Sequence, residues 1–192
     1  MGKLIIVRHG TTALNADGDR IRGWIDVPLN SDGVQEAVTT GKKLSQTIHL
    51  DGIITSDLKR AVQTAEEIAK ATGAPILFKT RALRPWNLGD LQGKKASDII
   101  AMVEHLIMNP NIETPSGESF DTFRTRTIDF LHTLPAYNHQ NIAIVTHYRV
   151  ERLWDAWTAA GQERDGIIAQ EVMANKGEKP GNYRVVDYPH KI

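Results

Sequence analysis

A short apolar stretch that ends in polar side chains occurs three times in this chain, and this pattern constrains the fold more than any other feature. The segments 4–7, 52–55 and 142–145 are apolar, mostly β-branched, and have the length of buried strands. Polar residues follow each segment, and the second and third lead directly into helical patterns. A strand, a polar turn and a helix form the unit of a parallel α/β sheet. We therefore expect the strands to present their carboxyl ends at one edge, where ligands bind in such folds.

The remaining segments fit the same architecture. Helical spacing of apolar residues predicts helices at 34–48, 58–69, 96–108, 120–134 and 150–157, with further strands at 75–78 and 183–187. Polar segments with Gly or Pro predict loops at 16–29, 81–93 and 161–182. No internal repeat, low-complexity tract or linker divides the chain. The expected fold is one domain over residues 1–192, an α/β three-layer sandwich with a mainly parallel central sheet flanked by helices.

The charge balance and the cysteine content exclude several classes of function. Lysine plus arginine and aspartate plus glutamate number 23 each, so no global field attracts nucleic acid or an anionic membrane. The absence of cysteine excludes disulfides, thiolate zinc sites and cysteine nucleophiles. No apolar run approaches the roughly 20 residues that span a bilayer, and no signal-peptide pattern precedes the first strand. We expect a cytoplasmic protein without nucleic-acid or membrane partners, and the sequence leaves its oligomeric state open.

The residues at the strand ends indicate a site for a phosphate group. Arg8 and His9 follow the first strand, Arg60 lies in the first turn of the helix after the second, and His147 follows the last. Guanidinium groups and helix amino termini both bind anions. A neutral histidine can attack phosphorus when its other ring nitrogen is hydrogen-bonded. Each residue alone also fits an ordinary loop or core role, and it is their recurrence at strand ends that favours phosphoryl chemistry.

Several motifs in the chain resemble the histidine phosphatase superfamily, whose older name comes from cofactor-dependent phosphoglycerate mutase. The first is LIIVRHGTTALN at 4–15. It is followed, in the family's order, by GWIDVPL at 23–29, SDLKRAVQTA at 56–65, PSGES at 115–119 and VTH at 145–147. Each motif alone is weak, whereas the combination is highly specific and covers about three quarters of the chain. The resemblance implies a phosphoglycerate mutase-like fold and phosphomonoester chemistry without a metal or other cofactor.

The resemblance also implies roles for individual residues. His9 would be the nucleophile that becomes phosphohistidine, with Arg8, Arg60 and His147 as the other members of the phosphate pocket. The further candidates for contact with the substrate are Thr11, Asn15, Arg22, Gly23, Glu118, Tyr148 and Arg149. Local turn or capping roles are the alternative for Thr11, Asn15 and Glu118, and surface roles for Arg22 and Arg149. The family usually has a small residue where Tyr148 stands, so we expect a narrower pocket.

One departure from the family pattern bears on the mechanism. The family usually carries a Leu-x-Glu-x-x-x-Gly segment whose glutamate protonates the leaving oxygen, and here Pro85 occupies that position. A general acid typically contributes roughly 10²- to 10⁴-fold in rate. Asp90, in the same loop, is the first candidate to replace it, and Asp17, Asp19 and Glu118 are others. The remaining alternatives are a substrate with a good leaving group or slow turnover.

The sequence therefore predicts a phosphatase that acts on a small phosphorylated compound through a phosphohistidine on His9. Two alternatives stay open. One is a phosphoglycerate mutase-type phosphotransferase. A chain of 192 residues leaves little room for the extra segments that hold a sugar acid in mutases during phosphate exchange. The other is a phosphate-binding or regulatory module that has lost its acid. The natural substrate depends on residues 16–29, 84–116 and 161–182, which carry no recognisable specificity code.

Overall fold

A five-stranded sheet forms the centre of the molecule in the computed structural model, which describes residues 2–165, 167, 171–172 and 177–189. The strand order is β3-β2-β4-β1-β5, with bounds Ile76–Thr80, Gly52–Ser56, Ile142–Thr146, Leu4–Arg8 and Tyr183–Val186. Strands β3, β2, β4 and β1 run parallel to one another, and β5 pairs antiparallel with β1. The mainly parallel sheet expected from the sequence is thus confirmed. The central strands β1, β2 and β4 are buried along their whole length, which explains their continuous apolar stretches.

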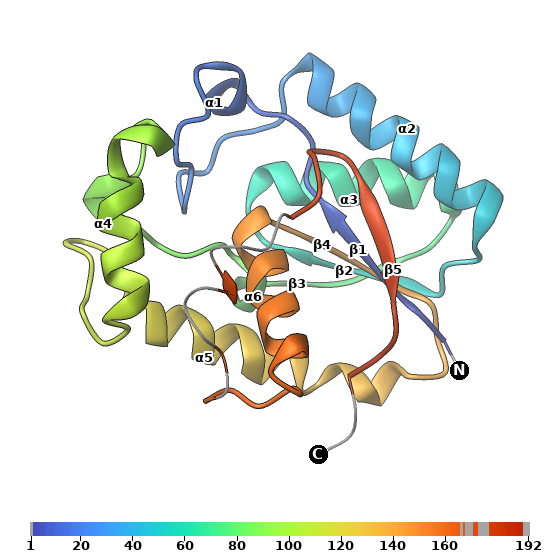
Figure 1. Ribbon diagram of the computed structural model, residues 1–192. Helices are drawn as coiled ribbons and strands as arrows, with labels where there is room; N and C mark the ends of the chain where they lie inside the picture. Colours follow the sequence, from blue (N-terminus) through green and yellow to red (C-terminus); the bar gives the residue numbers. More distant parts are fainter. Residues whose placement is uncertain (1, 166, 168–170, 173–176, 190–192) are drawn as a thin grey trace.

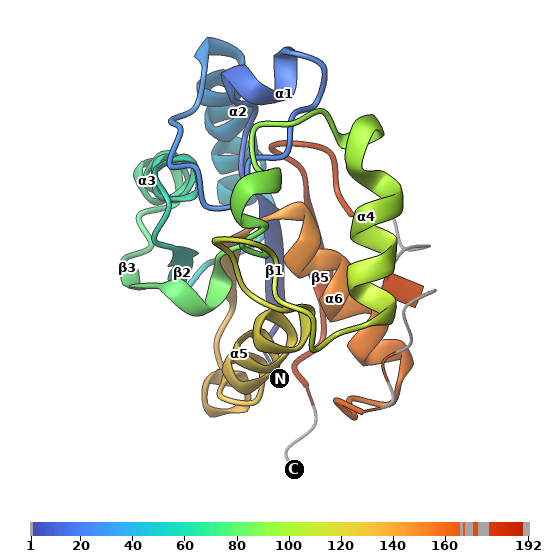
Figure 2. The ribbon, with the colours of Figure 1, turned by 90° about the vertical axis from the view of Figure 1, so that its left-hand side faces the viewer.

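Helices cover both faces of this sheet and complete the three-layer sandwich (Figures 1 and 2). Helices α2 (Ser31–Thr47) and α3 (Lys59–Thr72) lie on one face, and α5 (Phe120–Leu131) and α6 (Tyr148–Ala159) lie on the other. The alternation of side chains along β1 divides the core accordingly. Ile5 and Val7 join the cluster with α2 and α3, whereas Leu4 and Ile6 join the cluster with α5 and α6.

Helix α4 (Ala96–Met108) lies outside the three layers and, with the short α1 (Ala13–Ala16), stands beyond the end toward which β1 runs (Figure 1). Three 3₁₀ turns, η1 (Arg81–Leu83), η2 (Gly89–Leu91) and η3 (Leu134–Tyr137), complete the connections. Within the described ranges, no helix has the length and apolar character needed to cross a bilayer.

The observed elements differ from the predicted ones mainly at their ends. The sequence analysis missed α1, and α5 ends at Leu131 before the separate turn η3, so the predicted helix 120–134 was too long. Helix α6 begins directly after His147 and contains the predicted apolar positions 150–157. Several residues of the predicted loop 161–182 lie outside the described part of the chain.

Candidate active site

Two buried histidines follow adjacent parallel strands at the carboxyl edge of the sheet. Because β1 and β4 pair with Arg8 opposite Thr146, the next residues, His9 and His147, leave the sheet together. The backbone N–H of His9 donates to the carbonyl of Thr146 at 3.0 Å. The ring centroids are 5.0 Å apart with planes tilted by 58°, and each residue is only 2% exposed. The strand pairing alone therefore brings the two predicted imidazoles into one site.

The His9 ring is held in the form that a nucleophile requires. Its Nδ1 lies 2.7 Å from the carbonyl oxygen of Gly10. A carbonyl can only accept, so Nδ1 carries the proton and the lone pair is on Nε2. Burial, and then the positive charge of Arg60, holds the pKa of His9 well below its ordinary value. The ring is therefore neutral at physiological pH.

His147 shares this electrostatic environment and caps helix α6. It occupies the N-cap position, so the amino terminus of a 12-residue helix begins at the site. Burial, Arg60 and His9 together lower its pKa well below the ordinary value. Neither of its ring nitrogens has a hydrogen-bond partner among the described residues. Both remain available to a phosphate oxygen or to water.

Two arginines from different elements complete the centre. Arg60, in the first turn of α3, is 1% exposed and donates to the carbonyls of Gly23 and Ile25, each at 2.8 Å. Burial lowers its pKa to about 9, which still leaves it charged at neutral pH. Arg8, at the end of β1, donates to the carbonyl of Glu178 at 2.6 Å, and its guanidinium lies 4.8 Å from the Tyr148 ring centre. Backbone carbonyls thus fix both cations without neutralising them.

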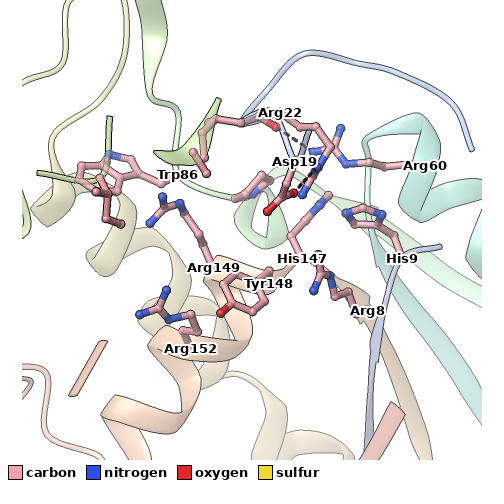
Figure 3. A pocket seen from close by; sticks show the side chains of 15 residues that line it. Arg8, His9, Asp19, Arg22, Arg60, Trp86, His147, Tyr148, Arg149 and Arg152 are labelled. Atoms are coloured by element: carbon pink, nitrogen blue, oxygen red, sulfur yellow. Dashed lines mark hydrogen bonds and ion pairs between the residues drawn. The ribbon is translucent and has the colours of Figure 1, made fainter. Parts of the chain in front are cut away.

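These residues open onto a cavity of about 330 Å³ (Figure 3). Five arginines line it, together with two imidazoles, one tyrosine, one carboxylate and several apolar side chains: Arg8, Arg22, Arg60, Arg149, Arg152, His9, His147, Tyr148, Asp19, Ile21, Pro85, Trp86, Ala96 and Ile100, with Gly23. The excess of positive charge suits a substrate with several negative charges.

The structure brings seven of the predicted site residues to this cavity: Arg8, His9, Arg22, Gly23, Arg60, His147 and Tyr148. Arg149, the other candidate for the remainder of the substrate, also lines it. Four predicted residues do not line it: Thr11, Asn15, Asp90 and Glu118.

The local partners of three of these residues explain their absence from the cavity. Thr11 donates to the Glu36 carboxylate through both its backbone N–H and its hydroxyl. Asn15 accepts from the backbone and the hydroxyl of Thr12, and forms a capping box. Glu118 pairs with Arg126 at 2.8 Å and accepts from a backbone N–H, so it holds a loop together. The capping alternative describes the contacts of Asn15, whereas Thr11 and Glu118 bind partners that are distant in the sequence.

Asp90 is exposed on the turn η2. Its backbone N–H donates to the carbonyl of Pro115. Pro85 does line the cavity, and its carbonyl accepts from Trp24 at 2.8 Å and Arg126 at 2.9 Å. Pro85 therefore lies at the cavity wall, held by its carbonyl, and Asp90 does not line the cavity. An acid role for Asp90 stays a prediction from the sequence, and the lining of the cavity does not include this residue.

Asp19 contributes the carboxylate that lines the cavity. Its backbone is in the left-handed region with φ of 49°, and its Oδ1 lies 3.3 Å from Nη1 of Arg22. On sequence, Asp90 ranks above Asp19 because it lies in the same loop as Pro85, and a position in a loop does not give the direction of a side chain. Five further lining residues, Ile21, Trp86, Ala96, Ile100 and Arg152, have no site role in the sequence-based prediction. The spacing of Arg149 and Arg152, one helical turn apart after His147, was the one signal that could have identified Arg152.

Comparisons with known proteins agree with this geometry. Residues 4–166 match the model of the histidine phosphatase superfamily, branch 1. Phosphoglycerate mutase-like protein 4 of Arabidopsis thaliana is 34% identical over 157 residues, which cover 78% of this chain and 68% of the relative. The metal-independent phosphoserine phosphatase of the same plant is 33% identical over 157 residues, covering 78% of this chain and 66% of the relative. The match thus spans about two thirds of each relative's length.

The structure of a putative alpha-ribazole-5'-P phosphatase from Escherichia coli superimposes with a TM-score of 0.77 at 25% identity, over 97% of this chain and 91% of that one. The fold, the order of the motifs and the strand-end histidines thus all agree with the match to the family model. The chain belongs to the histidine phosphatase superfamily, branch 1.

Proposed function

We propose that this protein is a metal-independent phosphatase that hydrolyses a small phosphorylated compound through a phosphohistidine on His9. The observation that carries the proposal is the buried, neutral His9 ring, with Nδ1 bound to the Gly10 carbonyl and a second imidazole 5.0 Å away. Two fixed guanidinium groups, Arg8 and Arg60, line the same cavity and can hold the phosphoryl oxygens. The similarity to a metal-independent phosphoserine phosphatase supports the same class of reaction.

In the first step, Nε2 of His9 forms a bond to phosphorus while the ester P–O bond breaks. The departing oxygen takes a proton, for which Asp19 is the carboxyl group at the cavity wall. In the second step, a water oxygen attacks phosphorus, the P–N bond breaks and the water proton returns to the carboxylate. His9 is then neutral again, and inorganic phosphate is the product. Transfer to a second hydroxyl in place of water would give mutase chemistry, which the relatives named phosphoglycerate mutase keep open.

Hydrolysis of p-nitrophenyl phosphate by wild type and His9→Ala tests the proposal. Loss of the nucleophile should reduce kcat by roughly three orders of magnitude or more. His139→Ala, at an exposed position away from the cavity, is the matched control and should retain full activity. Circular dichroism of both variants checks that they fold. The proposal requires that acid-labile phosphate be trapped on wild type and not on His9→Ala, and normal turnover by a folded His9→Ala would overturn it.

A further inference from the structure

Arg149 lines the cavity on the side away from the phosphate-binding centre, which is formed by Arg8, His9, Arg60 and His147. Figure 3 shows Arg8, His9, Arg60 and His147 on one side of the cavity and Arg149, Arg152 and Trp86 on the other, with Tyr148 between them. Helix α6 explains the separation. His147 is the N-cap residue of α6 and its side chain lies with His9, whereas Arg149 is in the first turn of the helix and Arg152 is one turn further on.

The arginines of the cavity differ in their partners. Arg8 and Arg60 donate to backbone carbonyls, and Arg22 pairs with Asp19 at 3.3 Å. Arg149 makes no hydrogen bond and no ion pair with any described residue, and its guanidinium lies 5.9 Å from the Trp86 ring centre. Burial is the main cause that lowers its pKa to about 10, with the like charge of Arg152 as the next. Arg149 is partly buried, and a partly buried guanidinium without a carboxylate partner gains stability when an anionic ligand pairs with it.

The charge balance of the cavity also favours a ligand with a second anionic group. Five guanidinium groups and one carboxylate line it. With Arg152 left out of the count, four guanidinium groups and one carboxylate remain, so a phosphate monoester dianion bound at His9 leaves one positive charge unbalanced in a cavity of about 330 Å³. The apolar wall between the two ends, which includes Trp86 and Ile100, suits a short carbon skeleton.

We propose that Arg149 forms a subsite for a second anionic group on the leaving-group side of the substrate. The ligand class is a short phosphomonoester that also carries a carboxylate or a second phosphate, since a planar guanidinium forms paired hydrogen bonds with either. This inference rests on the proposed function only in taking the first phosphate to lie at His9. It limits the substrate to doubly anionic compounds and assigns Arg149 as a residue that determines specificity.

Binding of non-hydrolysable phosphonates, measured by isothermal titration calorimetry, tests the subsite without any turnover. Phosphonocarboxylates of increasing chain length are compared with alkylphosphonates of the same length, and bisphosphonates of the same lengths distinguish a carboxylate from a phosphate as the second group. At the length that spans the two ends, the doubly anionic ligand should bind wild type at least about tenfold more tightly. Arg149→Gln should remove this advantage, and Arg149→Lys should keep part of it, because the charge remains and the paired geometry is lost.

Arg164→Gln is the matched control, since Arg164 is exposed, pairs with Asp129 and lies outside the cavity lining. It should keep the full preference for the doubly anionic ligand. The inference is overturned when no chain length gives a preference in wild type, or when Arg149→Gln keeps the preference. A failure of the proposed function is detected by a different measurement. In that case p-nitrophenyl phosphate would not be hydrolysed, irrespective of how the phosphonates bind.

Discussion

Asp19 and Asp17 are two aspartates of one loop with different surroundings. Asp17 pairs with Arg20 at 2.7 Å and does not line the cavity. Asp19 lines the cavity and lies 3.3 Å from Arg22, which lines it too. A substrate phosphate that pairs with the Arg22 guanidinium would therefore lie beside the Asp19 carboxyl group. The direction of one side chain thus decides which aspartate is a candidate acid.

Asp19→Asn should reduce hydrolysis of an alkyl phosphate by roughly 10²- to 10⁴-fold, since an alkoxide needs protonation as it leaves. The loss on p-nitrophenyl phosphate should be about tenfold or less, because nitrophenolate leaves without a proton. Asparagine tolerates the left-handed backbone found at position 19, so the loop keeps its shape. The measurement is kcat/KM on both esters. Asp17→Asn serves as the control, and an equal loss on both esters with Asp19→Asn would rule out an acid role for this residue.

At the scale of elements, the amino terminus of helix α2 supports the loop that carries His9. The backbones are in close contact, since a Cβ on Gly10 would lie 2.4 Å from the Gly33 carbonyl oxygen. A Cβ on Gly33 would lie 2.0 Å from the carbonyl oxygen of Thr11. The Asn30 side chain caps the helix by accepting from the N–H of Gly33 at 2.8 Å. Two glycines therefore let the helix start pack directly against the nucleophile loop.

Gly33→Ala should push these two backbones apart. We expect it to lower the free energy of unfolding by about 1–3 kcal/mol, the usual cost of overpacking a tight site. We also expect a lower kcat on p-nitrophenyl phosphate, because the His9 loop shifts with Thr11. Urea unfolding and steady-state kinetics measure the two effects. Ser31→Ala, at an exposed position in the first turn of the same helix, should change neither quantity. Wild-type stability in Gly33→Ala would contradict this account of the contact.

At the scale of the whole molecule, the segment 177–182 forms hydrogen bonds with strand β1 and with helices α2 and α6, which lie on opposite faces of the sheet. Arg8 of β1 donates to the Glu178 carbonyl, Thr40 of α2 donates to the Gly181 carbonyl, and Glu151 of α6 accepts from the Glu178 N–H at 2.8 Å. Glu151 is fully buried, and burial raises its pKa to about 7. A titratable group therefore sits at the junction that also orients Arg8.

The sign of the stability change follows from this raised pKa. The unfolded Glu151 loses its proton near pH 4.5 and the folded one near pH 7, so its contribution is fully present below 4.5 and is lost as the pH rises to 7. Glu151→Gln should thus become more stable relative to wild type by up to about 1.4 kcal/mol per pH unit in that window, and the difference should level off above it. Urea unfolding at a series of pH values measures this difference.

The exposed substitution Glu66→Gln is the control and should give a difference from wild type without this slope. The lowered pKa values of His9 and His147 act in the opposite sense, because they reduce stability as the pH falls below about 6.5. They are common to wild type and Glu151→Gln and therefore cancel in the comparison. A flat difference between pH 4.5 and 7 would mean that Glu151 titrates normally.

The sequence by itself determined the sheet and the four residues at the centre of the candidate active site. Buried parallel strands read as continuous apolar stretches, and neighbouring strands end at one edge, so Arg8, His9, Arg60 and His147 follow from local pattern. The tertiary structure alone decided the loops. Whether Asp19 or Asp90 faces the cavity depends on contacts between distant segments, such as Arg126 and Trp24 with the Pro85 carbonyl, for which spacing along the chain carries no information. The same holds for Arg149, because only the folded arrangement shows that its guanidinium lines the cavity and has no hydrogen-bond or ion-pair partner in the part of the chain that the structure describes.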